Sequence, residues 1–141
     1  MPNDPHDLAR FLTAQDRQYP QVLNELRAGQ KTSHWMWYVF PQIQGLGSSG
    51  TARFYAIASL DEAKAYLAHP VLGARLVECT ALVNGVQNRS IVDILGAVDA
   101  MKFRSSMTLF REAAGDSVFQ NALDRYFDGN PDELTLGLLR T

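Results

Sequence analysis

Apolar residues recur every three or four positions along most of the chain, which is the spacing of one face of an α-helix. The clearest of these stripes joins Leu72, Leu76, Cys79 and Val83. The other stripes are Leu8, Phe11 and Leu12; Val22, Leu23 and Leu26; Phe103, Met107, Phe110 and Ala114; Phe119 and Leu123; and Leu134, Leu138 and Leu139. No stretch alternates convincingly between apolar and polar residues, as a half-buried strand would. The pattern therefore predicts an all-α fold.

Prolines, glycines and capping residues divide these stripes into about seven helical segments. Pro20 suits the first turn of a helix that ends at Gly29, and Asn84–Gly85 ends the helix with the clearest stripe. The predicted N-caps are Asp7, Ser59 or Asp61, Ser90, Asp99 and Asp116. No long linker or repeat divides the sequence. We therefore expect a single compact helical domain over residues 8–141, preceded by a flexible N-terminal arm over residues 1–7.

The least polar part of the sequence runs from His34 to Phe40 and holds both tryptophans. A helix that is apolar all round is normally buried, so the run predicts a tryptophan-rich central helix that ends at Pro41, with Trp35 or Trp37 in the core. The same residues could instead form a pocket wall whose aromatic rings stack on a ligand. A buried His34 would need a hydrogen-bond partner, and that partner could be structural or catalytic.

Composition indicates a globular protein that we expect in the cytoplasm. Of 141 residues, 46% are hydrophobic and 20% are charged, which is enough apolar surface to offset the entropy of ordering the chain. The formal net charge is −2 and the 13 lysines and arginines are spread along the chain, so nucleic acid is not an expected partner. The N-terminus does not resemble a signal peptide, and the longest apolar run is too short to span a membrane.

A second segment of interest lies on the predicted helix that Asp99 opens. Lys102 and Ser106 are four residues apart on one flank of its apolar stripe, and Arg104 lies on the other flank. Cations and hydroxyls beside a core face can hold an anionic small molecule, but the same side chains can equally form a solvated flank. The candidate ligand-binding residues are Lys31, Trp37, Lys102, Arg104, Ser105 and Ser106, and His34 is the candidate catalytic acid or base.

The segment Gly45–Gly50 is rich in glycine and serine. Loops of this composition can bind phosphate through backbone N–H groups. This one lacks the lysine of a phosphate-binding loop, so a flexible connector is the other interpretation.

We expect neither a metal nor another cofactor. The three histidines, His6, His34 and His69, lack the spacing of metal ligands, and Cys79 is the only cysteine. Cys79 falls on an apolar stripe, where a cysteine is typically an inert small hydrophobe. A lone cysteine also fits a reducing compartment.

Several long motifs occur in a fixed order: Ser33–Tyr38 with Phe40–Gln42, Gly45–Ser49, His69–Gly73, Lys102 with Arg104–Phe110, and Asp132–Leu136. In these motifs the sequence resembles the domain of unknown function 1810 family, small bacterial proteins sometimes mislabelled as calpastatin. The resemblance covers Asp4 to Leu139 and implies an all-α fold, but it supplies no activity. The histidine–aromatic segment with the later Lys/Ser-rich helix is also faintly similar to helical proteins that act on ADP-ribose-type substrates.

Two functions stay open on the sequence alone. The chain could bind or act on a phosphorylated or nucleotide-like small molecule, including an ADP-ribose-type compound. Since no complete catalytic motif is present, it could instead be a non-catalytic interaction module or a homodimer. We expect His34 and the segment Lys102–Ser106 to meet in space, because hydroxyls are suitable partners for an imidazole. A pocket that joins them would favour the ligand hypothesis, and a flat apolar face would favour a protein partner.

Overall fold

The computed structural model describes residues 4–140, and its regular secondary structure is helical. The ten helices within this range are α1 (Ala9–Asp16), α2 (Tyr19–Ala28), α3 (Met36–Val39), α4 (Gly50–Phe54), α5 (Leu60–Ala68), α6 (Leu72–Asn84), α7 (Ile91–Leu95), α8 (Ala97–Ala113), α9 (Ser117–Phe127) and α10 (Glu133–Leu139). Extended backbone pairs only in an isolated bridge between Ile43 and Ile57, among the residues described. The predicted all-α fold is confirmed, with more helices than the segments expected from the stripes.

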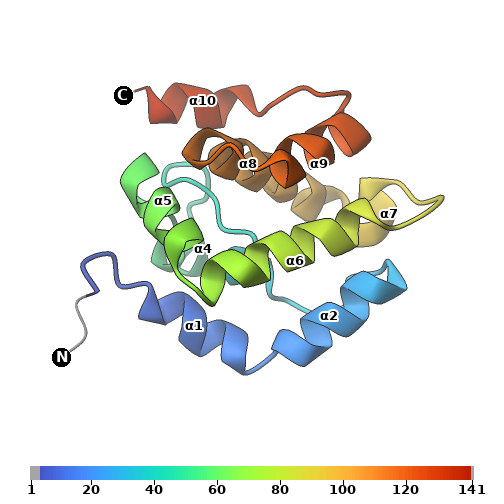
Figure 1. Cartoon of the computed structure of the whole chain (residues 1–141), viewed down its shortest axis with the longest axis horizontal. Helices are drawn as coiled ribbons and strands as arrows, with labels where there is room; N and C mark the ends of the chain where they lie inside the picture. The colour runs from blue at the N-terminus through green and yellow to red at the C-terminus, as the bar shows by residue number, and fades with distance from the viewer. Residues whose placement is uncertain (1–3, 141) are drawn as a thin grey trace.

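The longest helix, α8, forms the centre of the fold. It packs against α5, α7, α9 and α10, while α6 contacts α2, α5 and α9 (Figure 1). From Ser105 to Phe110 every residue of α8 is buried, because neighbouring helices cover all of its faces. The stripe of Phe103, Met107 and Phe110 is fully buried, as its helical spacing predicts.

The tryptophan segment is not the central helix. Helix α3 is a single turn, and Trp35 precedes it with non-helical dihedral angles (φ −144°, ψ 7°). The backbone before Trp35 is held as a loop, because the Glu25 carboxylate accepts hydrogen bonds from the N–H groups of Thr32 and Ser33. The expectation that one tryptophan lies in the core holds for Trp35, whose exposed fraction is 0%, whereas Trp37 is half-buried.

The predicted N-terminal arm divides between described and undescribed residues. Residues 1–3 lie outside the described range, and residues 4–7 make specific contacts with α1. The Asp4 carboxylate accepts hydrogen bonds from the N–H groups of Leu8 (2.8 Å) and Ala9 (3.0 Å). Asp4, and not Asp7, therefore satisfies the first turn of α1, and Asp7 occupies a turn with a φ of 51°.

Most other helix boundaries follow the capping signals of the sequence. Gly29 ends α2 with a φ of 71°, a conformation that glycine adopts without strain. Ser59, Ser90 and Asp116 each accept a backbone hydrogen bond at the start of their helices, as predicted. The exception is α8, which begins two residues before Asp99 and follows directly after Gly96.

Candidate functional site

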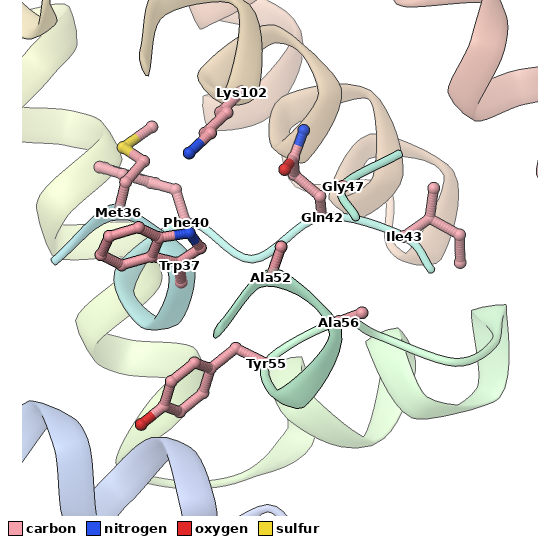
Figure 2. Close-up of a pocket in the computed structure, with 10 residues that line it drawn as sticks. All are labelled: Met36, Trp37, Phe40, Gln42, Ile43, Gly47, Ala52, Tyr55, Ala56 and Lys102. Carbon is pink, nitrogen blue, oxygen red and sulfur yellow. The ribbon is translucent and has the colours of Figure 1, made fainter. Parts of the chain in front are cut away.

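Three adjoining pockets share Trp37 and Lys102 in their walls. The inner pocket, shown in Figure 2, has a volume of about 10 Å³, which leaves room for no more than one water molecule. The second pocket is lined by Lys31, His34 and Asp99, and for these side chains we call it the polar pocket. It has a volume of about 370 Å³. The third pocket, which we call the apolar pocket, is lined in part by Leu46, Val98, Met101 and Leu134 and has a volume of about 550 Å³. The polar and apolar pockets thus fall within the size range of small-molecule sites.

Lys102 lies at the junction of these pockets. Figure 2 shows its side chain reaching from α8 toward Trp37, and its Nζ lies 5.0 Å from the centroid of the indole ring. The nearest carboxylate oxygen, Asp99 Oδ1, is 3.8 Å away, at the outer limit of an ion pair. A quarter of the Lys102 side chain remains exposed. We call the polar and apolar pockets together the groove. The Lys102 ammonium is therefore only loosely paired and is open to this groove.

Lys31 is bound much more closely than Lys102. Its Nζ lies 2.8 Å from Asp99 Oδ2, and only 7% of its side chain is exposed. The same ammonium donates a hydrogen bond to the carbonyl of Ser33 (2.5 Å) and lies 5.0 Å from the Trp35 ring centroid. Lys31 and Asp99 thus largely neutralise each other, which leaves Lys102 as the accessible positive charge of the polar pocket.

The Glu25 carboxylate organises the loop that carries Lys31 and His34. It accepts hydrogen bonds from the Trp35 indole (3.0 Å), from the Ser33 hydroxyl (2.7 Å) and from two backbone N–H groups of that loop. Burial acts to raise the pKa of Glu25, but these hydrogen bonds outweigh burial and bring the pKa from 4.5 to about 2. A charged Glu25 therefore fixes one wall of the polar pocket.

His34 and Lys102 line the same pocket, although 68 positions separate them in the sequence. The sequence predicted that His34 meets the segment Lys102–Ser106. Of that segment, Lys102 shares a pocket wall with His34, but Ser105 and Ser106, the predicted hydroxyl partners, do not line that pocket. His34 is exposed, so its imidazole does not need a partner inside the protein. His34 thus lines the polar pocket while remaining exposed to solvent.

The other candidate residues of α8 are distributed differently. Ser105 lines the apolar pocket, where its hydroxyl donates to Asp132 Oδ2 (3.0 Å). Arg104 lines none of the three pockets, because its guanidinium donates to the carbonyls of Asn130 and Pro131 and so fixes the loop before α10. Ser106 is also absent from the three walls, and its buried Oγ has no hydrogen-bond partner within residues 4–140.

The glycine-rich segment forms part of the apolar pocket through Leu46, Gly47, Ser48 and Ser49. A Cβ on Gly47 would lie 2.6 Å from the Cβ of Ala52, so the loop can approach α4 this closely only with glycine there. Ser49 caps α4 by accepting a hydrogen bond from the N–H of Ala52 (3.0 Å). The segment is therefore a close-packed connector that also lines a pocket.

The apolar pocket is also lined by three large, exposed apolar side chains, Val98, Met101 and Leu134. Their exposed fractions are 69%, 57% and 70%, respectively. We call these three residues the apolar shelf. Sequence reasoning missed both the shelf and Asp99 as parts of a site. For Asp99 a signal was available, because Asp99 and Lys102 are three residues apart and so share a helix face.

Within residues 4–140, no three histidine, cysteine or carboxylate side chains gather as metal ligands would. Burial raises the pKa of the Cys79 thiol from 9.0 to about 12, which disfavours the reactive thiolate. No helix in the described range is both long enough and apolar enough to cross a membrane.

Comparisons with known proteins identify relatives but no activity. The chain is similar to a conserved hypothetical protein of Mycobacterium tuberculosis, Rv1873, whose crystal structure matches with a TM-score of 0.97 and 53% identity over 98% of this chain and 99% of that one. No protein with curated function matches the chain. The model of the family described as "Protein of unknown function (DUF1810)" matches residues 5–139. Because this match spans nearly the whole sequence, the chain belongs to the DUF1810 family.

Proposed function

We propose that the chain binds a small phosphorylated or nucleotide-like molecule in the polar and apolar pockets, with its anionic group on Lys102. The observation that carries the proposal is the position of the Lys102 ammonium, which lines both pockets and is only loosely paired, 3.8 Å from Asp99. An ammonium of this kind offers up to three hydrogen-bond donors to a phosphate. ADP-ribose-type compounds belong to the proposed class of ligands.

The remaining candidate residues contribute unequally to this proposal. Lys31, Trp37 and Ser105 belong to the walls of the groove, whereas Arg104 and Ser106 are left out of the proposed site because they contact neither pocket. His34 stays a candidate for an acid or base, because its exposed imidazole lines the polar pocket. A His34→Gln variant should keep its melting temperature, since the side chain is exposed, and any loss of ligand binding would then point to function.

The direct test is a thermal-shift screen with inorganic phosphate, ribose 5-phosphate, adenosine monophosphate and ADP-ribose at millimolar concentration. A ligand present at ten times its Kd should stabilise the protein by about 1.4 kcal/mol, which raises the melting temperature by roughly 3 to 5 °C. The Lys102→Gln variant should lose this shift. Lys64→Gln is the matched control, because Lys64 is exposed on α5 and forms no ion pair within the described part of the chain. An unchanged shift in Lys102→Gln, or no shift with any of these compounds, would contradict the proposal.

The apolar shelf favours a second candidate, a non-catalytic interaction module or homodimer. Exposed apolar side chains that gather on one surface often mark a protein interface. Sedimentation velocity over a hundred-fold range of protein concentration would test the homodimer. A monomer at every concentration would remove it and leave the ligand proposal standing.

A further inference from the structure

We infer that the ligand carries an apolar or aromatic group next to its anionic group, and that this group lies on the apolar shelf of Val98, Met101 and Leu134. The inference rests on the proposed function and narrows its ligand class. It predicts that phosphates with an apolar or aromatic group, such as a nucleobase, bind more tightly than inorganic phosphate and simple sugar phosphates.

Exposed apolar side chains gather at the apolar pocket. Within residues 4–140, six large apolar side chains are strongly exposed, and the three that form the shelf all line the apolar pocket. The other three, Phe54, Val71 and Val92, lie outside that pocket. Single exposed apolar residues are ordinary, but a group of them on a pocket wall provides a surface that a ligand can remove from water.

Two residues of the shelf, Val98 and Met101, lie next to Lys102 on the same helix. Val98 and Lys102 are four residues apart on α8, so they lie on one helix face with their Cβ atoms about 5 to 6 Å apart. Both residues also line the apolar pocket, so a group that extends from a phosphate on the Lys102 ammonium adjoins the shelf. Val98 also lines the polar pocket, so the shelf continues into it.

Trp37, the aromatic residue that the sequence suggested for stacking, is less suitable than the shelf. The Lys102 ammonium already covers a face of the Trp37 ring, at 5.0 Å from its centroid. A ligand ring stacking there would have to displace the cation that binds its phosphate. The shelf is free of this conflict, and it is the neighbouring apolar surface of the same groove.

The shelf is also held in a fixed shape. Leu134 belongs to α10, whereas Val98 and Met101 belong to α8. The two helices are joined at Asp132, whose N–H donates to the Thr108 hydroxyl (2.8 Å) and whose carboxylate accepts from Ser105 (3.0 Å). The backbone that carries the shelf therefore needs little reorganisation when a ligand binds, which favours affinity.

The test compares two phosphates that differ in a ring. Adenosine monophosphate and ribose 5-phosphate carry the same phosphate and sugar, but only the first has a base. We expect calorimetry to show adenosine monophosphate binding at least about ten-fold more tightly, because the base buries apolar surface on the shelf. In the double variant Val98→Thr, Met101→Gln this advantage should fall below about three-fold, while the affinity for ribose 5-phosphate stays the same.

Two further variants keep this comparison decisive. Val92→Thr is the matched control, because Val92 is exposed on α7 and lies outside both pockets, and it should leave the ten-fold advantage intact. Leu134→Gln reaches the shelf from α10, so it should reduce the advantage even if the double variant folds poorly.

The outcomes separate this inference from the proposed function. Equal affinity for the two phosphates, with both lost in Lys102→Gln, would overturn the shelf and keep the phosphate site. Absence of binding by either phosphate, or binding that ignores Lys102→Gln, would overturn both. A double variant that dissociates a dimer but retains the preference for adenosine monophosphate would make the shelf a self-association face, which also overturns the inference.

Discussion

The Lys102 ammonium lies 5.0 Å from the centroid of the Trp37 indole ring, so the proposed anion-binding cation is in contact with a natural fluorophore. An anion that pairs with Lys102 changes the electric field at Trp37. Titration with adenosine monophosphate should therefore change the intrinsic fluorescence of the protein. The other tryptophan, Trp35, is fully buried and hydrogen-bonded to Glu25, so its emission should stay constant.

Single substitutions show which tryptophan gives the fluorescence change. Trp37→Phe should abolish the fluorescence response, and Trp35→Phe should retain it. A response that survives in Trp37→Phe would show that Trp35, and not Trp37, senses the ligand.

The Asp99 carboxylate lies near the ammonium groups of both Lys31 and Lys102. Its removal should strengthen phosphate binding at Lys102 but lower the stability that Lys31 contributes. In Asp99→Asn the carboxylate that competes for Lys102 is gone, so phosphate affinity measured by calorimetry should rise about three- to ten-fold. Lys31 loses its close partner at 2.8 Å, and because that lysine is largely buried the free energy of unfolding should fall by about 1 to 3 kcal/mol. Asp61→Asn is the control, since Asp61 is exposed in the first turn of α5 and should change neither quantity. Weaker phosphate binding by Asp99→Asn would show that the carboxylate assists the ligand.

Much of the fold can be predicted because its signals are local. The caps at Ser59, Ser90 and Asp116 and the glycine stop at Gly29 depend on residues within one helical turn, and each forms as the sequence indicates. The prediction of a central helix from His34 to Phe40 was wrong for a different reason. The loop before α3 is held by Glu25, a residue of another helix, and local apolar spacing contains no information about that contact.

The candidate site shows the same division. Lys102 and Arg104 lie close together on one helix and both carry a positive charge. The sequence therefore predicted both as ligand-binding residues. Their roles separate only when the chain folds, because Lys102 faces the groove while the loop before α10 takes up the guanidinium of Arg104. The apolar shelf could not be predicted from the sequence for a related reason. Leu134 comes close to Val98 and Met101 only because α10 packs on α8.

Cys79 should be chemically inert in the native protein. It is fully buried, and burial raises the pKa of its thiol to about 12, so the thiolate is scarce at neutral pH. We expect a thiol reagent such as dithiobisnitrobenzoate at pH 8 to react with the native chain at least about a hundred-fold more slowly than with the chain unfolded in urea. Rapid reaction of the native protein would show that α6 opens readily or that the cysteine is accessible.

Glu25 should make stability depend on pH in the acid range. Its pKa is about 2 in the folded protein, below the usual 4.5, because four hydrogen bonds favour the carboxylate over the acid. A depressed pKa contributes stability that is complete above pH 4.5 and is lost as the pH falls from 4.5 toward 2, with a total of at most about 3 kcal/mol.

A Glu25→Gln variant isolates this contribution. At pH 7 its free energy of unfolding, measured in urea, should be lower than that of the wild type by about 2 kcal/mol or more, because the amide oxygen cannot replace a charged acceptor of four hydrogen bonds. Between pH 4.5 and 2 the variant should lose less stability than the wild type. Glu133→Gln is the control, since Glu133 is exposed at the start of α10, and its acid profile should match that of the wild type. Because Glu25 also fixes the loop that carries Lys31 and His34, the variant should bind phosphate more weakly at pH 7, where it remains folded. Parallel acid profiles for Glu25→Gln and the wild type would show that the carboxylate does not hold this loop.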